Sequence, residues 1–208
     1  IVVMGMGEPL ANLDNLLPAL DIACSDQGLG ISHRRITIST VGLPAPLDRL
    51  TALGTAYQLA VSLHAPNDEI RTQIVPTNKS TGLADILAAA DRYFLASGRR
   101  LTFEYVLLAE INDRPEHAQE LVELLRGRTM LLNVIPYNPV AGLPYKTPSG
   151  NATNRFRDIL IAGGINVKFR QRKGSEIDAA CGQLRRSTPT LLNVEVMPTA
   201  TTGQNSPA

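Results

Sequence analysis

The sequence is poor in cysteine, in net charge and in long apolar runs, and each shortage excludes a class of protein. Its 208 residues include only two cysteines, which offer neither a disulfide framework nor a metal-ligand spacing. A formal net charge of +1 gives no overall field for a polyanion, so any nucleic-acid surface must be local. No apolar stretch reaches the roughly 18 residues of a membrane span, and the first residues lack a signal peptide's basic start. These shortages predict a cytoplasmic protein.

Six short apolar runs predict β-strands, at residues 1–6, 35–40, 57–63, 101–109, 130–136 and 165–170. Most are nearly continuous in apolar residues, which is typical of strands buried on both faces. Apolar residues three or four positions apart predict helices between several of them. These helices run from Leu13 to Cys24, from Leu83 to a stop at Gly98, from a start at Pro115 through Leu125, and through Phe156 to a stop at Gly163.

The alternation of strands and helices predicts a parallel α/β fold, either an open doubly wound sheet or a barrel of strands wrapped by helices, and we favour the barrel. Both architectures place ligands at the carboxyl ends of their strands. In this sequence those ends carry small or polar residues, which are Gly7, Glu8, Ser39, Thr40, Ser62, His64, Asn138, Arg170 and Arg172. The periodicity fades after Leu184, so residues 1–186 are predicted to form the barrel and residues 187–208 a disordered tail.

The glycine-rich turn at residues 5–9 is the first candidate for a ligand site. Gly5 and Gly7 have no Cβ, so backbone groups could approach a bound molecule, and Glu8 could accept hydrogen bonds from an ammonium or a ribose. Taken alone, the same turn could simply join a strand to a helix. The three histidines form no ligand pair in the sequence, so hydrogen bonding at the rim of the cavity suits His64 better than metal binding.

The two cysteines have different surroundings. Cys24 falls on the apolar stripe of its helix and is interpreted as a packed, structural thiol. Cys181 lies just beyond the last strand, and its small neighbours would leave the thiol accessible. A packing role would be preferred for a lone cysteine, but the motif around Cys181 reverses that preference.

Five segments taken together resemble one known family. They are Gly5-Met6-Gly7-Glu8-Pro9-Leu10, Ser39-Thr40-Val41-Gly42, Ser62-Leu63-His64, Ile135-Pro136-Tyr137-Asn138-Pro139 and Asp178-Ala179-Ala180-Cys181-Gly182-Gln183-Leu184. In this order they resemble the RlmN/Cfr family of radical S-adenosylmethionine (SAM) RNA methyltransferases, and the RlmN branch is the nearer match. The resemblance covers residues 1 to about 186. It implies a partial (β/α)6 TIM-like barrel of the radical SAM type, here without its first strand and cluster loop.

The resemblance also implies a function, which is methylation of adenine C2 in 23S rRNA and in tRNA. S-adenosylmethionine and a [4Fe-4S] cluster are the implied cofactors, and an electron donor for the cluster and a monomeric state are expected. Adenine C2 lies between two ring nitrogens and is too electron-poor to attack a methyl sulfonium, so the reaction needs a radical. The residues implied to contact S-adenosylmethionine are Gly7, Glu8, Ser39, Ser62, Leu63, His64 and Asn138.

Cys181 has the central chemical role that the resemblance implies. It takes a methyl group from one S-adenosylmethionine, and a 5′-deoxyadenosyl radical made from a second one removes hydrogen from that S-methyl group. The methylene radical adds to the base, a general base removes the ring proton, and a second cysteine releases the product through a transient disulfide bond. Cys181 would therefore be both methyl carrier and covalent link.

The sequence departs from the family in one respect that matters. It contains no Cys-x3-Cys-x2-Cys, although three thiolates anchor such a cluster and leave one iron open. The resolving cysteine, the general-base glutamate and the accessory RNA-binding domain, which precede this point in family members, are missing too. Truncation is the expected explanation. We therefore predict that this chain alone neither holds a cluster nor turns over.

Arg172 and Lys173 are the predicted RNA contacts, because they lie between the last strand and Cys181. The target adenine is expected to be splayed out into the cavity. Two rival interpretations stay open. One is a noncatalytic barrel remnant that binds SAM or RNA but has lost its cluster segment. The other is an unrelated (β/α) barrel lyase or aldolase, which the lack of a candidate Schiff-base lysine on any predicted strand disfavours.

Overall fold

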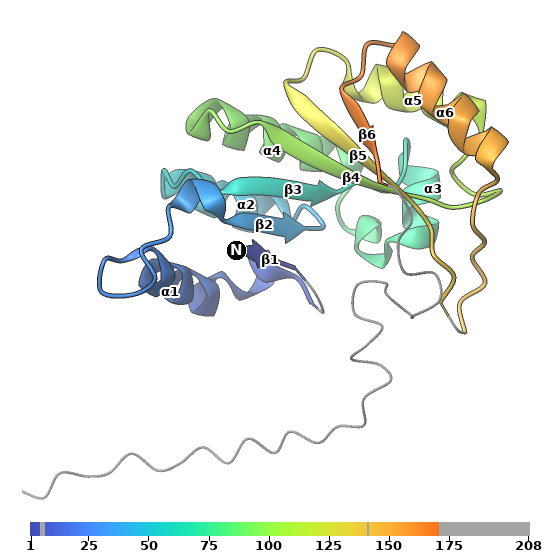
Figure 1. Ribbon diagram of the computed structural model, residues 1–208. Coiled ribbons are helices and arrows are strands. Elements are labelled where there is room, and N and C mark those ends of the chain that lie inside the picture. Colours follow the sequence, from blue (N-terminus) through green and yellow to red (C-terminus); the bar gives the residue numbers. More distant parts are fainter. Residues whose placement is uncertain (5–6, 141, 171–208) are drawn as a thin grey trace, which may run out of the picture.

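The computed structural model describes residues 1–4, 7–140 and 142–170. Six parallel strands form one sheet in sequential order, β1-β2-β3-β4-β5-β6 (Figure 1). They are β1 (Val2–Val3), β2 (Thr37–Thr40), β3 (Gln58–Ser62), β4 (Leu101–Leu107), β5 (Met130–Pro136) and β6 (Val167–Phe169). A doubly wound sheet reverses its strand order at a switch point, and this sheet does not. Its two end strands, β1 and β6, do not pair. The fold is therefore the predicted partial barrel.

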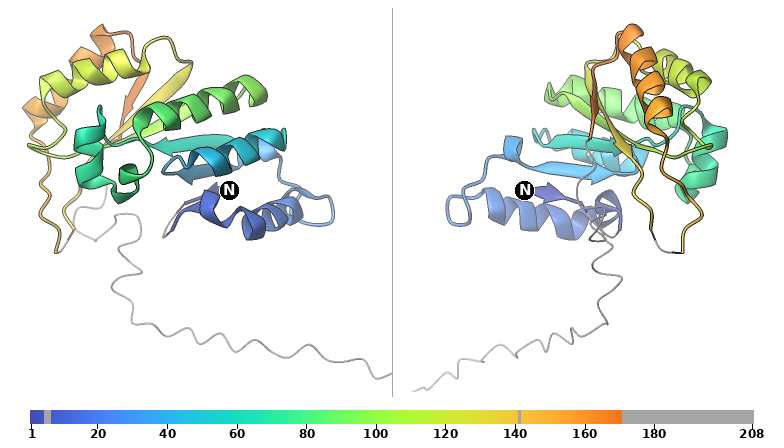
Figure 2. Two further views of the ribbon diagram at one scale, coloured as in Figure 1. Left: turned by 180° about the vertical axis from the view of Figure 1, so that it is seen from behind. Right: turned by 45° about the vertical axis from the view of Figure 1, so that its right-hand side comes forward.

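Helices connect successive strands and lie along the outer face of the curved sheet (Figures 1 and 2). Within the described residues none is long and apolar enough to cross a membrane. The α-helices are α1 (Leu13–Cys24), α2 (Pro44–Ala52), α3 (Asp68–Ile74), α4 (Leu83–Ser97), α5 (Pro115–Leu125) and α6 (Gly150–Ala162). Short 3-10 helices are η1 (Pro9–Asn12), η2 (His33–Arg35) and η3 (Pro76–Lys79).

All six predicted strands and all four predicted helices are present, and their ends follow the expected chemistry. The residue after α4 is Gly98, whose φ of 61° is the left-handed conformation that favours glycine. Pro115 opens α5, where its missing N–H has no helical partner to lose. Helices α2 and α3 were not predicted from the sequence. Helix α2 begins with Pro44 and Pro46, which are typical of loops and turns, and α3 has only seven residues, too few to show a clear apolar period.

Strands β2, β4 and β5 are fully buried on one face only, which corrects the expectation of burial on both faces, whereas β3 has three consecutive buried residues. In β4, buried residues alternate with partly buried ones. The buried side chains belong to the core beneath the helices, and Tyr105, for example, packs against Phe156 of α6 with ring centroids 5.6 Å apart. The partly buried ones, Thr102, Glu104 and Val106, lie on the opposite, concave face. No second layer covers that face within the described residues, so polar side chains can stand there.

Candidate functional site

The predicted cofactor contacts that the structure describes lie at one edge of the sheet. Adjacent parallel strands end at the same edge, so residues near strand ends become neighbours although they lie far apart in the sequence. Gly7 and Glu8 follow β1, Ser39 lies in β2, Ser62 ends β3 and is followed by Leu63 and His64, and Asn138 follows β5. Cys181, Arg172 and Lys173 lie outside the described residues.

Glu8 joins the turn after β1 to the end of β2. Its Oε1 accepts hydrogen bonds from the Leu10 N–H (2.9 Å) and the Thr40 hydroxyl (2.7 Å), and its Oε2 accepts one from the Val41 N–H (2.7 Å). A carboxylate offers about four acceptor sites, so the residues that the structure describes leave one site on Oε2 unused. Sequence reasoning assigned Glu8 a ligand role and missed this cross-strand one, because Thr40 and Val41 lie more than 30 positions away.

Gly7 is required by its backbone conformation. Its φ of 112° is one that side chains rarely adopt, yet a Cβ at this position would meet no atom within 4 Å. An open groove of about 430 Å³ runs beside the turn and includes Val3, Met4, Gly7 and Glu8 in its lining. The rest of its lining belongs to η1 and α1, so the groove runs between the turn and the first helix.

Arg71 of α3 fixes the ends of β2 and β3, and sequence reasoning missed it. Its side chain is only 1% exposed. Its Nη2 donates to the carbonyls of Val41 (2.8 Å) and Ser62 (3.1 Å), and its Nε donates to the carbonyl of Leu63 (3.0 Å). Its Nη1 donates to Oδ1 of Asn78, which is itself buried (2.8 Å). One guanidinium therefore holds two of the strand ends that carry predicted cofactor contacts.

His64 has a strained backbone and a fixed hydrogen-bonding role. Its φ is 60°, a left-handed conformation that costs a non-glycine residue about 1–3 kcal/mol. Its Nδ1 accepts a hydrogen bond from the Val106 N–H (3.1 Å), and its carbonyl accepts one from the buried Asn112 (2.8 Å). Burial lowers the pKa of His64 to about 4, and the positive charge of Arg71 is a second, smaller cause of this shift. The imidazole is therefore neutral at pH 7, and its Nε2–H can donate.

Leu63 lies between these polar residues but faces the core, where its side chain is fully buried. Its N–H donates to the Glu104 carbonyl (2.9 Å), and its own carbonyl accepts from Arg71. Any contact of Leu63 with a ligand would have to come through this backbone.

Glu104 is a second residue that sequence reasoning missed. It lies on the concave face of β4, in register with Ser62 of β3 and Asn133 of β5. The side-chain amide of Asn133 donates to its Oε2 (2.7 Å). Burial raises the pKa of Glu104, while the Asn133 hydrogen bond and the charge of Arg170 partly offset the rise. A single carboxylate inside an otherwise largely apolar strand was the available signal.

The described residues hold no obvious metal site. No group of three or more His, Cys, Asp or Glu side chains within residues 1–4, 7–140 and 142–170 could bind a metal ion. Cys24 is a free thiol, partly buried and packed against the core. Contrary to the sequence-based expectation of no lysine on any strand, Lys168 lies on β6. Its side chain is exposed and lacks the apolar pocket that activates a Schiff-base lysine.

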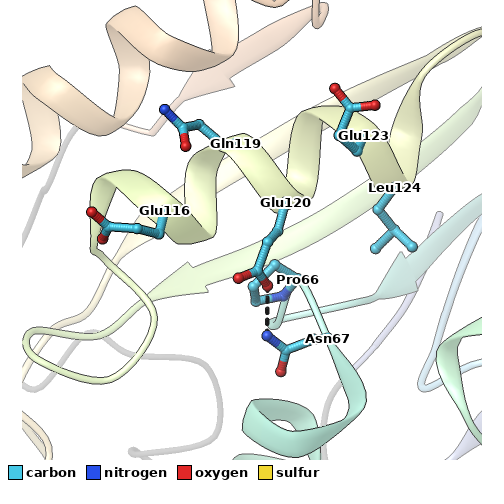
Figure 3. Close-up of a pocket in the computed structure, with 7 residues that line it drawn as sticks. All are labelled: Pro66, Asn67, Glu116, Gln119, Glu120, Glu123 and Leu124. Atoms are coloured by element: carbon cyan, nitrogen blue, oxygen red, sulfur yellow. Dashed lines mark hydrogen bonds between the residues drawn. The ribbon is translucent and has the colours of Figure 1, made fainter.

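A second groove, of about 720 Å³, lies on the helical side of the molecule between the start of α3 and α5 (Figure 3). Its polar lining includes Glu116, Glu120 and Glu123, and the Asn67 side-chain amide donates to Glu120 (2.6 Å). Three carboxylates would repel phosphate groups. The strand ends are therefore the better candidate for a site that binds a nucleotide or RNA.

Comparisons with known proteins point to one family, although no family model matches the sequence. The chain is 68% identical over 187 residues to a probable dual-specificity RNA methyltransferase RlmN of Rhodopirellula baltica, which covers 90% of this chain and 50% of the relative. It is 48% identical over 186 residues to a dual-specificity RNA methyltransferase RlmN of Marinobacter nauticus, with 88% and 50% covered. The chain belongs to the RlmN family. It spans about half the length of these curated RlmN relatives.

A solved structure supports the same placement. A radical SAM methyltransferase from Sphaerobacter thermophilus matches with a TM-score of 0.84 and 45% identity, over 88% of this chain and 54% of that one. Membership of the RlmN family sets aside the unrelated barrel lyase.

Proposed function

We propose that this chain is the catalytic portion of a dual-specificity methyltransferase that modifies adenine C2 in 23S rRNA and in tRNA. The observation that carries the proposal is the 68% identity to a relative named as a probable dual-specificity RNA methyltransferase RlmN. The gathering of Gly7, Glu8, Ser62 and His64 at one edge of the sheet supports it, since this is the edge at which barrels of parallel strands bind their ligands. The protein works as a cytoplasmic monomer and receives electrons from a separate donor.

The described residues suit the chemistry of S-adenosylmethionine. The acceptor site left on Glu8 Oε2 suits the ammonium, and the hydroxyls of Ser39 and Ser62 and the donor Nε2–H of His64 suit its other polar groups. Asn138, half-buried after β5, adds an amide at the same edge. When bound, S-adenosylmethionine supplies the methyl group and the radical. The polar residues at the strand ends orient it, and burial together with the charge of Arg71 keeps the His64 imidazole neutral.

The residues of this chain do not suit a [4Fe-4S] cluster. The sequence has two cysteines and no Cys-x3-Cys-x2-Cys, whereas a cluster of this type is held by thiolates. We therefore expect the chain alone to hold no cluster and to be inactive. Cys181 takes up a methyl group as a thioether and becomes the sulfur that links protein to base, and a second cysteine outside this sequence releases the product. Arg172 and Lys173 hold the RNA backbone beside it.

Mass spectrometry of the full-length protein tests the proposal. Purified active protein should carry a methyl group on the Cys181 peptide, and Cys181→Ala should abolish both this adduct and adenine methylation. Cys24→Ala is the matched control, because Cys24 packs against the core away from the strand ends, and it should keep both. Active protein with an unmodified Cys181 would contradict the mechanism. Binding of S-adenosylmethionine without adduct or methylation would instead identify a noncatalytic remnant.

A further inference from the structure

Glu104 occupies a position that packing alone does not explain. On β4 its neighbours Phe103 and Tyr105 point into the core and are fully buried, whereas Glu104 lies on the concave face and is partly buried. Its register partner on β3 is Ser62, a predicted cofactor contact, and neighbouring strands lie about 4.8 Å apart. Glu104 is thus one strand away from the residues already assigned to the site.

The carboxylate is held in place but not fully used. Asn133 donates to Oε2 (2.7 Å), and Arg170 attracts the charge from the end of β6. Oε1 accepts no hydrogen bond from the residues that the structure describes. Partial burial of a carboxylate with a single hydrogen bond is unfavourable for folding. A residue that costs stability at the mouth of a site is typical of a ligand contact.

We propose that Glu104, oriented by Asn133, is a specificity-determining residue that accepts a hydrogen bond from adenosine bound on the concave face. The inference rests on the proposed function, in which adenosine is present twice, in S-adenosylmethionine and in the target nucleotide. In both, the N6 amino group and the ribose hydroxyls are donors, and a carboxylate, which only accepts, is suited to them. Glu104 selects for such donors through Oε1, while Asn133 holds Oε2.

The test uses the full-length protein with Glu104→Gln, which keeps the size of the side chain but loses its charge. Thr102→Val is the matched control, since Thr102 is also partly buried on the concave face of β4, two residues away. Isothermal titration calorimetry measures binding of S-adenosylhomocysteine in one arm. In the other arm, binding of an RNA hairpin with the target adenosine is compared with that of the same hairpin carrying purine riboside, which lacks the amino group. Thermal unfolding is followed for every variant.

Glu104→Gln should weaken binding in one arm about tenfold or more, because the Asn133 donor holds the Gln oxygen and leaves its NH2 group, which cannot accept, in place of Oε1. Hydrogen bonds to charged groups contribute about 1.5–3 kcal/mol. A loss for S-adenosylhomocysteine places the contact on the cofactor. A loss for the adenosine hairpin that is not seen for the purine hairpin places it on the substrate. The unfolding temperature should stay the same or rise, and Thr102→Val should bind as the wild type does.

Three results would overturn the inference. Glu104→Gln could bind S-adenosylhomocysteine and both hairpins within twofold of the wild type. It could instead lose affinity for every probe together with a lower unfolding temperature, which would make Glu104 a structural residue. A wild-type protein that binds neither S-adenosylhomocysteine nor the hairpins would refute the proposed function as well. Intact methylation by Glu104→Gln with unchanged binding would refute only the role of Glu104.

Discussion

The buried guanidinium of Arg71 leads to the sharpest test of how the strand ends are held. Arg71→Met removes four hydrogen bonds at once and leaves the carbonyls of Val41, Ser62 and Leu63 and the Asn78 side chain without this donor. Methionine fills much of the same volume, so the change acts mainly on polar contacts. The free energy of unfolding should therefore fall because buried acceptors lose their partner.

The size of the effect follows from the number of lost donors. Each buried acceptor left unsatisfied costs about 1–3 kcal/mol, and the removal of a desolvated charge offsets part of the sum. Breaking a buried charged network by removing one partner costs about 3–5 kcal/mol, so we expect a loss of about 4 kcal/mol. A domain is stable by only about 5–15 kcal/mol, so the variant should be barely folded at 37 °C.

Urea denaturation followed by circular dichroism measures the loss. The free energy of unfolding falls with urea concentration at about 2 kcal/mol/M, so the urea midpoint of Arg71→Met should be about 2 M lower than that of the wild type. The midpoint of Arg71→Lys should lie between those of the wild type and Arg71→Met, because an ammonium has fewer donors than a guanidinium, in a less extended arrangement. Arg92→Met is the control. Arg92 makes two hydrogen bonds of 2.8 Å to Asp48 but exposes about half of its side chain, so its midpoint should hardly change. A midpoint shift for Arg71→Met no larger than that for Arg92→Met would refute the reasoning.

Two further predictions concern His64 and Gly42. The pKa of His64 is about 4 in the folded state and 6.5 as the ordinary value, so the unfolded state gains its proton first as the pH falls. The contribution of neutral His64 to the free energy of unfolding is complete above pH 6.5 and is lost as the pH falls to 4, and it amounts to at most about 3 kcal/mol. His64→Gln should flatten this part of a curve of unfolding free energy against pH. An unchanged curve would contradict the low pKa of His64. Gly42→Ala should destabilise by about 1–3 kcal/mol, since φ is 90° and the new Cβ would lie 2.5 Å from Ile86 Cγ2. Gly98→Ala also changes a glycine with positive φ, 61°, but one with open space around it, so equal losses in thermal unfolding would show that the Ile86 contact is unimportant.

Apolar periodicity was enough to predict the strands and the longer helices, because each buries a regular row of residues against the core. It could not predict α3, which is short and begins with a side-chain cap from Asn67 to the Ile70 N–H. Missing α3 meant missing Arg71, whose partners Val41 and Ser62 come from two other elements. A charged residue in a short polar segment looks like surface until the tertiary structure buries it.

The candidate site was predictable to the extent that its residues sit next to strand ends. Gly7, Ser62 and His64 follow this rule, and parallel pairing brings them to one edge. Glu104 does not follow it, because it lies inside a strand, and the alternation of β4 that exposes it on the concave face is hard to see among apolar neighbours. The role of Cys181 remains a prediction, since it lies outside the described residues.

The Arg71 clamp also sets a rule for how this sequence can vary in length. An α-helix turns about 100° per residue, so inserting or deleting one residue between Asp68 and Arg71, inside α3, would turn the guanidinium away from the two strand ends that it binds. Loops that carry no such clamp, such as the one between α4 and β4, can gain or lose residues at little cost. Natural relatives should therefore show a constant spacing here and variable spacing there.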